Sequence, residues 1–350
     1  MADRANANAY DAIQALGRLI EPVLCFDGET VADYHAWRSR FADAYRRCLG
    51  PWPEPADPES EVASEEDMGD HVRLKLYFHS SPGVTVPAYL LIPKGIGQGE
   101  RRPGILAAHG HGNGKDDAVG LDQGKDERTA LIRSLNYDYG LQAVRRGYVV
   151  IAPDWIPFGE RRPPAEWSRP NRDPCNVVSM AWEYYGYTLL AQNVWDGMRA
   201  LDLLAARPEV DADRLAVLGL SYGGTMTTHL AINDPRVKVA VISGYLSTVK
   251  GDALTMRGKG NFCGAQYVPG LLRYGDIPEM AGLIAPKPLL IEAGTRDDCF
   301  VIEDVRVAYE RLARIYAAAG ASDRLAYDEH PGQHEWHGTV AWDWLHQWLR

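Results

Sequence analysis

The sequence lacks the charge pattern of a nucleic-acid-binding protein and any hydrophobic run long enough to cross a membrane. Its 350 residues carry a formal net charge of −10, and no basic stripe offsets that excess of acid. We therefore expect no nucleic-acid partner. No apolar stretch approaches the roughly 20 residues that a membrane-spanning helix needs, so we expect a soluble protein without a membrane partner.

A secretory signal and a disulfide framework are also missing. Residues 1–20 are rich in Ala and Asn and lack the basic start and apolar centre of a signal peptide. The five cysteines, at positions 25, 48, 175, 263 and 299, are odd in number, scattered and without metal-type pairing. These features favour reduced thiols and a cytoplasmic location, and we expect neither a metal nor a cofactor. The oligomeric state stays open, a homo-oligomer included.

The composition is sufficient for a large buried core, because 46% of the residues are apolar. We divide the chain into an N-terminal helical appendage with a linker, residues 1–67, and a main domain, residues 68–350. Aromatic residues recur at helical spacing over 30–49 and predict an amphipathic helix. Residues 51–67 are rich in proline and acid, and we expect them to hold no regular structure.

The main domain alternates between strand-like and helical patterns. Alternating residues at 73–79 and 85–93 predict an antiparallel pair. Buried-strand runs follow, separated by helical patterns, which predicts an α/β class with a mostly parallel, doubly wound sheet of about eight strands. The later predicted strands are 104–108, 148–152, 215–220, 237–243, 288–293 and 324–328, with a final helix from Trp336.

Two connections are much longer than the usual few residues, 113–139 and 155–187. Long insertions at the carboxyl edge of such a sheet shape a binding site in most α/β proteins, although surface decoration is the alternative.

The most informative stretch is 214–228, where an apolar run ends in the Gly-Leu-Ser-Tyr-Gly of residues 219–223 and a helical pattern follows. This order of strand, tight turn and helix is that of a nucleophile elbow. A serine at the apex takes strained backbone angles, and glycine on either side avoids collisions with neighbouring backbone. We therefore predict Ser221 as a nucleophile and the backbone N–H of Tyr222 as an oxyanion donor.

A nucleophilic serine needs a base, and the base needs an orienting acid. Asp297 follows the predicted strand 288–293, and we choose it as the acid, with Asp298 in reserve. His334 lies in the loop 330–337 after the next strand, and we choose it as the base. The two other histidines of that loop are assigned structural roles.

The loop after the first parallel strand has the sequence His-Gly-His-Gly at 109–112. We predict the N–H of His111 as the second oxyanion donor, with Gly112 as the close alternative. A phosphate-loop pattern fails here because Asp116 stands where Ser or Thr should bind a metal. A zinc motif at His334 fails because Gly338 stands where the second histidine should be.

Two further sets of residues receive weaker predictions. Glu160 and Arg161 are expected to form a structural ion pair. Aromatic residues of the long connections and beyond are expected to line an acyl or alcohol pocket. The aromatic candidates are Trp155, Phe158, Tyr184 and Tyr267, together with Trp182 and Tyr185.

Four parts of the sequence together resemble the α/β-hydrolase superfamily: residues 219–224, 109–112, 294–297 and His334. Within that superfamily they resemble the acetyl xylan esterase-like and dienelactone hydrolase-like branch. The likeness extends from about residue 73 onward. It departs at two points, since dienelactone hydrolases carry a cysteine nucleophile where this chain has Ser221, and carbohydrate acetylesterases usually have glutamine in place of Tyr222. The departures leave the triad intact and put the substrate in doubt.

The resemblance implies an α/β-hydrolase fold, and the residues favour a serine hydrolase that cleaves a small-molecule carboxylic ester through an acyl-enzyme intermediate. Three alternatives stay open: a peptidase or amidase, a hydrolase of carbon-carbon bonds, and a non-catalytic ligand receptor that keeps the pocket and discards the machinery.

Overall fold

The computed structural model of the chain describes residues 8–57, 59–167, 169, 172–258 and 262–350. Residues 1–7 lie outside this range. They belong to the segment 1–20, in which we predict no signal peptide. The strands are β1 (Ser60–Asp67), β2 (His71–Ser81), β3 (Val84–Pro93), β4 (Arg102–Ala108), β5 (Val149–Pro153), β6 (Val210–Leu220), β7 (Val237–Ser243), β8 (Leu289–Gly294) and β9 (Leu325–His330). The α-helices are α1 (Ala9–Leu19), α2 (Val31–Leu49), α3 (Lys115–Ala118), α4 (Asp126–Ser134), α5 (Tyr139–Arg145), α6 (Pro174–Tyr184), α7 (Leu189–Ala205), α8 (Tyr222–Asn233), α9 (Ile277–Gly282), α10 (Ile302–Ala318) and α11 (Ala341–Trp348).

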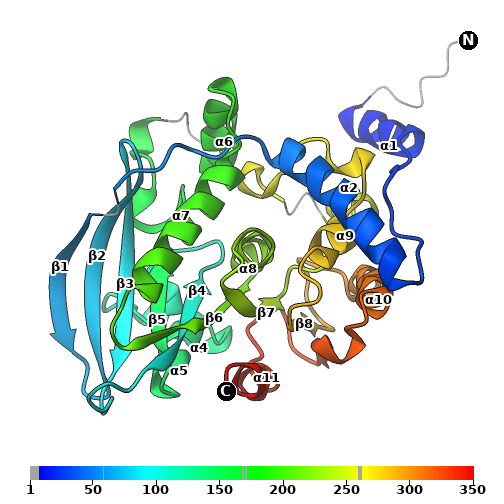
Figure 1. Cartoon of the computed structure of the whole chain (residues 1–350). Coiled ribbons are helices and arrows are strands. Elements are labelled where there is room, and N and C mark those ends of the chain that lie inside the picture. Colours follow the sequence, from blue (N-terminus) through cyan, green and yellow to red (C-terminus); the bar gives the residue numbers. More distant parts are fainter. Residues whose placement is uncertain (1–7, 58, 168, 170–171, 259–261) are drawn as a thin grey trace, which may run out of the picture.

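In the described chain the strands form one nine-stranded sheet in the order β1-β2-β3-β5-β4-β6-β7-β8-β9. The strands β1, β2 and β3 are antiparallel to their neighbours. The other six strands, β5, β4, β6, β7, β8 and β9 in their order across the sheet, are parallel to one another. Helices cover both faces (Figure 1). The predicted α/β class with a mostly parallel sheet is confirmed, and every predicted strand overlaps an observed one.

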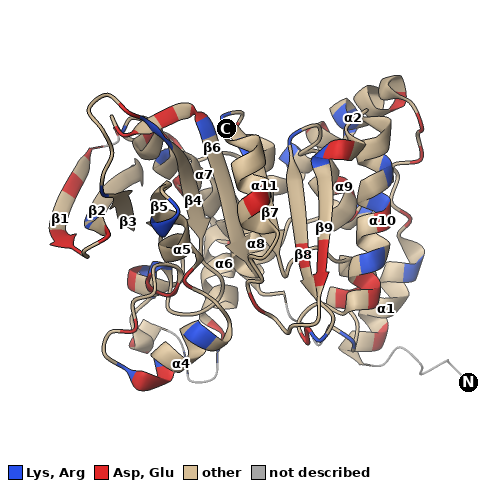
Figure 2. Cartoon of the chain, turned by 90° about the horizontal axis from the view of Figure 1, so that it is seen from below, with Lys and Arg blue, Asp and Glu red and all other residues tan. Residues whose placement is uncertain are grey.

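The additional strand, β1, lies in the segment that was expected to be irregular, so that expectation is wrong for 60–67. β1 is an edge strand whose side chains are almost all exposed, and several of them are acidic (Figure 2). Backbone hydrogen bonds to β2 hold it, helped by an ion pair of 2.7 Å between Glu66 and Arg73. An edge strand that buries neither face needs no apolar alternation, and the sequence therefore carries no strand signal there.

Side chains of the central strands point alternately into two cores, one on each face of the sheet. Leu106 and Val217 face the core under α7, α8 and α10, while Ile105 and Leu218 face the core under α5 and α11. Strands buried on both faces appear as continuous apolar runs, which is why the sequence locates them well. The last helix begins at Ala341 rather than at Trp336, whose indole is buried instead beneath α5.

The predicted amphipathic helix is present as α2, which packs against α9 and α10 (Figure 1). Its Tyr34 hydroxyl donates a hydrogen bond to the carbonyl of Ala285 at 2.5 Å, and Phe41 is fully buried. The aromatic face of α2 belongs to the same core as α7 and α8. The division of the chain at residue 67 stays a prediction. Among the described helices, none has both the length and the apolar character needed to traverse a bilayer.

Glu292 of β8 is a carboxyl group inside the sheet, only 1% exposed. One oxygen accepts a hydrogen bond from the Gly338 N–H at 2.8 Å. Burial raises the pKa of Glu292 from 4.5 to about 7, against the hydrogen bonds from Gly338 and Ser243 that lower it. The nearby Asp328 adds to the increase and His337 opposes it. The folded protein therefore holds this carboxyl protonated in mildly acidic solution.

We predict that Glu292→Gln removes a pH dependence of stability. Between the ordinary pKa and the raised one, the folded state binds a proton that the unfolded state has released, so stability falls as the pH rises through this window and is level above it. The wild type should lose about 3 kcal/mol of unfolding free energy relative to Glu292→Gln between pH 4.5 and pH 8. Urea denaturation at both pH values measures this. Equal pH dependence in the two proteins would contradict the assignment, and Glu303→Gln, at an exposed carboxyl of α10, is the control.

Candidate active site

Ser221 lies at a sharp turn between β6 and α8, with φ +61° and ψ −122°. Such angles are strained for a residue with a side chain. The Ser221 N–H donates to the carbonyl of Ser243 at 3.0 Å. A Cβ atom at Gly219 or Gly223 would lie 2.4 or 1.9 Å from the carbonyl oxygen of Ala108. The turn can therefore form only with glycine at both positions, as the sequence predicts.

Asp297 and His334 come from the loops after the neighbouring parallel strands β8 and β9. The His334 Nδ1–H donates to Asp297 Oδ2 at 2.8 Å. The other Asp297 oxygen accepts the N–H groups of Cys299 at 2.7 Å and Phe300 at 3.0 Å. The carboxylate is thus held by its own loop while it holds the imidazole. Asp298, the reserve candidate, contacts the Cys299 sulfur instead, at 3.8 Å.

The His334 ring is confined from two sides. Phe300 stacks on it, with ring centroids 5.8 Å apart and planes at 27°. Gly244 lies so close that a Cβ there would be 3.1 Å from the imidazole. With the Asp297 hydrogen bond, these contacts restrict the ring to one orientation, which is what a positioned base requires.

Ser221 and His334 line the same pocket, of about 370 Å³. The loop after β4 approaches Ser221 closely, since a Cβ at Gly110 would lie 3.3 Å from the Ser221 Cβ. The remaining lining residues are His111, Tyr137, Asp173, Asn176, Phe262, Cys263 and Cys299. The structure therefore brings the predicted nucleophile, base and oxyanion loop to one place.

Sequence reasoning did not single out the connection between β7 and β8, which supplies Phe262 and Cys263 to the pocket. This connection, residues 244–288, is longer than either of the two that were predicted to shape the site. Its length was the available signal, since connections much longer than the usual few residues often shape functional sites.

Tyr222 and His111, the predicted oxyanion donors, pack together with ring centroids 5.3 Å apart. Tyr222 begins α8, so its N–H is at the positive end of the helix dipole. Its buried hydroxyl accepts a hydrogen bond of 2.7 Å from Asn193. The His111 ring also meets Phe158 edge-on, at 5.0 Å. The donor roles of the two N–H groups stay predictions.

The four aromatic residues predicted to bind substrate are not among the residues that line the pocket containing Ser221. Trp155 is completely buried in the core and offers no surface to a ligand, so its assignment to the pocket is wrong. Phe158 is 6% exposed, Tyr267 is 44% exposed and Tyr184, at the end of α6, is 93% exposed. None of these three described residues lines the pocket that contains Ser221, and their substrate roles stay predictions. Sequence position placed Phe158 and Tyr184 in a long connection, but it could not give the direction of any of these side chains.

The expected ion pair between Glu160 and Arg161 is also wrong. Glu160 pairs with Lys115 and with Lys75 at 3.0 Å, whereas Arg161 pairs with Asp196 at 2.6 Å. Adjacent residues on a helical turn project in different directions, so each reaches a different partner. Burial would raise the pKa of Glu160, but hydrogen bonds from Lys115, Tyr77 and Lys75 outweigh it and lower the pKa to about 2.

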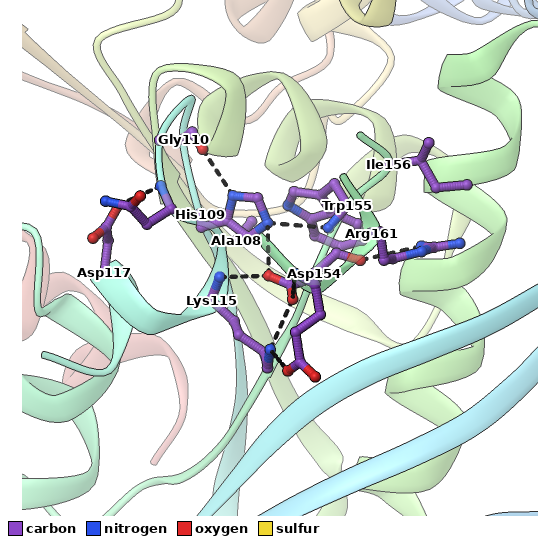
Figure 3. A network of polar contacts seen from close by, with 12 residues as sticks. Ala108, His109, Gly110, Lys115, Asp117, Asp154, Trp155, Ile156 and Arg161 are labelled. Carbon is purple, nitrogen blue, oxygen red and sulfur yellow. Dashed lines mark hydrogen bonds and ion pairs between the residues drawn. The ribbon is translucent and has the colours of Figure 1, made fainter. Parts of the chain in front are cut away.

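A buried charge network lies beneath the loop after β4 (Figure 3). Asp154, fully buried, accepts the Lys115 N–H on one oxygen and the Lys115 ammonium on the other, each at 2.7 Å. His109 Nε2 accepts the Trp155 N–H at 3.0 Å, and its Nδ1–H donates to Gly110 O at 2.7 Å. Burial lowers the pKa of His109, which keeps it neutral. Together these contacts fix both ends of the loop that carries His111, a role that the sequence did not indicate.

We predict that Lys115→Met strongly destabilises the fold, because it leaves the Asp154 carboxylate buried without its cation. Breaking a buried pair from one side costs about 3–5 kcal/mol, to be measured as the free energy of unfolding in urea. The matched control is Arg306→Met, which breaks a surface pair with Glu329 and should cost less than about 1 kcal/mol. Similar losses in both variants would show that the buried network does not hold the site.

Comparisons with known proteins agree with this architecture. A family model described as "Abhydrolase family" matches residues 1–329. "Putative hydrolase YtaP" of Bacillus subtilis (strain 168) is 29% identical over 282 residues, covering 79% of this chain and 87% of that protein.

Two solved structures are similar in fold. A "putative acetyl xylan esterase" from Bacteroides fragilis has a TM-score of 0.76 and 20% identity, covering 92% of this chain and 82% of that one. A glucuronoyl esterase from Solibacter usitatus has a TM-score of 0.63 and 16% identity, covering 88% and 90%.

Proposed function

Because this chain belongs to the abhydrolase family and has the α/β-hydrolase fold, we propose that it hydrolyses carboxylic esters with Ser221 as nucleophile, His334 as base and Asp297 as orienting acid. One observation carries the proposal. The imidazole that donates to Asp297 at 2.8 Å lines the same pocket as the strained serine of the elbow. The relatives named above as hydrolases and esterases support the same reaction class.

In this mechanism Asp297 binds the Nδ1–H of His334, which leaves the Nε2 lone pair available for the Ser221 hydroxyl. The Ser221 oxygen attacks the ester carbonyl carbon as its proton moves to Nε2. The carbon-oxygen bond to the alcohol then breaks, and the alcohol leaves with that proton. Water attacks the acyl-enzyme by the same path, and the acid is released from Ser221.

The negative charge that develops on the carbonyl oxygen needs two N–H donors in this pocket. We assign the N–H of Tyr222, at the start of the twelve-residue helix α8, and the N–H of His111, with Gly112 as the alternative. One such donor contributes roughly 3 kcal/mol to transition-state stabilisation. The buried pair of Lys115 and Asp154 supports this proposal because it holds the loop that carries His111.

The size and charge of the pocket suggest the substrate class. Its volume of about 370 Å³ is near the lower end of the roughly 300–1,000 Å³ typical of ligand sites. Tyr137 and Phe262 supply apolar surface, while Asp173 places a carboxylate in the wall. A short acyl group and an uncharged ester fit these properties better than a long chain or an anionic substrate.

Ser221→Ala should lower kcat/KM for p-nitrophenyl acetate by more than about 10³-fold, since the nucleophile is removed. It should also abolish covalent labelling by a serine-directed phosphonate probe. Ser134→Ala, at an exposed serine of α4, is the matched control and should leave both readouts unchanged. Activity within about tenfold of the wild type would remove Ser221 from its proposed role.

The two adjacent aspartates offer a sharper test of the acid. Asp297→Asn should reduce kcat about 10⁴-fold, because an amide in place of the carboxylate leaves the imidazole in the wrong tautomer. Asp298→Asn should stay within a few-fold of the wild type, because its side chain does not meet His334. The kinetics of both variants are measured with the same ester. The reverse order of effects would make Asp298 the acid.

A further inference from the structure

A second group of reactive side chains meets the Ser221 pocket, because two of its three members, His111 and Cys263, line that pocket. His111, Cys175 and Cys263 place their nitrogen and sulfur atoms within 4.8 Å of one another. The His111 Nε2 is 3.1 Å from the Cys263 sulfur. The three residues come from separate segments: the loop after β4, the first turn of α6 and the connection between β7 and β8. Their meeting is thus a product of the tertiary fold, which no spacing in the sequence indicates.

The two thiols are buried, at 6% and 7% exposure. Interaction with Cys175, followed by the hydrogen bond with His111, lowers the pKa of Cys263, although burial opposes this. Interaction with Cys263 raises the pKa of Cys175 in turn. A thiolate beside an imidazole nitrogen is the form in which cysteine binds metals.

The backbone that carries the two cysteines is fixed by its own hydrogen bonds. Asn176 Oδ1 accepts the Gly264 N–H at 2.8 Å, and the Ser179 hydroxyl donates to the Gly264 carbonyl at 2.9 Å. Asp173 accepts the Cys175 N–H at 2.7 Å. A Cβ at Gly264 would lie 2.6 Å from Ser179, so the two segments are in direct contact. The sulfur atoms are held near each other before any ion arrives.

We propose that His111, Cys175 and Cys263 bind a borderline-soft divalent ion of the Zn²⁺ class and that the bound ion inhibits the enzyme. Two sulfur donors and one imidazole match the preference of Zn²⁺ for nitrogen and sulfur ligands in tetrahedral geometry, with water in the fourth position. Cysteine binds such an ion as the thiolate, so binding releases thiol protons to solvent.

Inhibition follows from the position of the site, and this part of the proposal rests on the proposed esterase function. His111 and Cys263 line the pocket that contains Ser221, so the ion and its water occupy space that the ester needs. The His111 backbone is also the assigned oxyanion donor, and coordination of its ring fixes that loop in the ion-bound arrangement. Zn²⁺ should therefore compete with the ester.

Binding can be tested without any enzymatic readout by titrating the fully reduced protein with Co²⁺. Sulfur-to-cobalt charge-transfer absorption and tetrahedral ligand-field bands should appear and saturate at one ion per chain, and Zn²⁺ should abolish them. Cys175→Ser and Cys263→Ser should weaken Co²⁺ binding by more than about tenfold. His111→Gln provides a variant with both thiols intact, and circular dichroism checks that each variant is folded.

Cys299→Ser is the matched control, because Cys299 lines the same pocket and belongs to a different group, with Asp297 and His334. Its Co²⁺ bands should equal those of the wild type. Absence of the bands in the wild type, their persistence in the double variant Cys175→Ser/Cys263→Ser, or their loss in Cys299→Ser alone would overturn the assigned site.

The inhibitory effect is measured as the Zn²⁺ dependence of p-nitrophenyl acetate hydrolysis. Zn²⁺ should raise the apparent KM in the wild type, a chelator should reverse this, and Cys263→Ser should need more than about tenfold more Zn²⁺. Saturated metal binding with unchanged turnover would overturn the inhibition. A wild type that binds Co²⁺ as described but hydrolyses no ester would contradict the proposed function and leave the metal site standing.

Discussion

The contact between the end of β4 and the turn that carries Ser221 is the constraint on which the rest of the site depends. The Ala108 carbonyl oxygen occupies the space that a Cβ at Gly219 or Gly223 would need. Because β4 and β6 are paired neighbours, the end of β4 lies directly against the turn in which Ser221 has its strained angles. It also places Gly110 and the loop that follows β4 against the serine. Ser221 and the loop proposed to carry an oxyanion donor are therefore positioned by the same backbone contact.

Polar groups buried below this contact stabilise it at a cost in desolvation. Asp154 and Lys115 are almost wholly buried, and an ion pair in such a place contributes little net stability compared with apolar packing. What the pair contributes is geometry. Asp154 binds both the backbone and the ammonium of Lys115, while His109 binds the strand end at Trp155. The loop between them is held at both ends, and its His111 contacts Cys263 and lines the same pocket as Ser221.

Much of the fold, and the meeting of Asp297 with His334 beside the turn of Ser221, could be predicted because the signals are local. Glycine at 219 and 223 is a steric requirement that the chain shows directly in its sequence. The central strands are buried on both faces, so their apolar runs stand out from the helical patterns between them. Asp297 and His334 follow two successive strands of a parallel sheet, and parallel strands end at one edge. The sequence order alone therefore predicted that these two side chains would meet, as they do at 2.8 Å.

The sequence by itself thus determined the class of fold, the elbow at Ser221 and the edge of the sheet where the site lies, because steric and periodic patterns act over a few residues. Only the tertiary structure decided which partners meet across long separations. Two examples are the pair Lys115 and Asp154 and the pair Cys175 and Cys263. Each pair joins segments whose relative placement depends on how three long connections pack. The direction of each side chain, outward for Tyr184 and inward for Trp155, is set by that packing, and no local pattern encodes it.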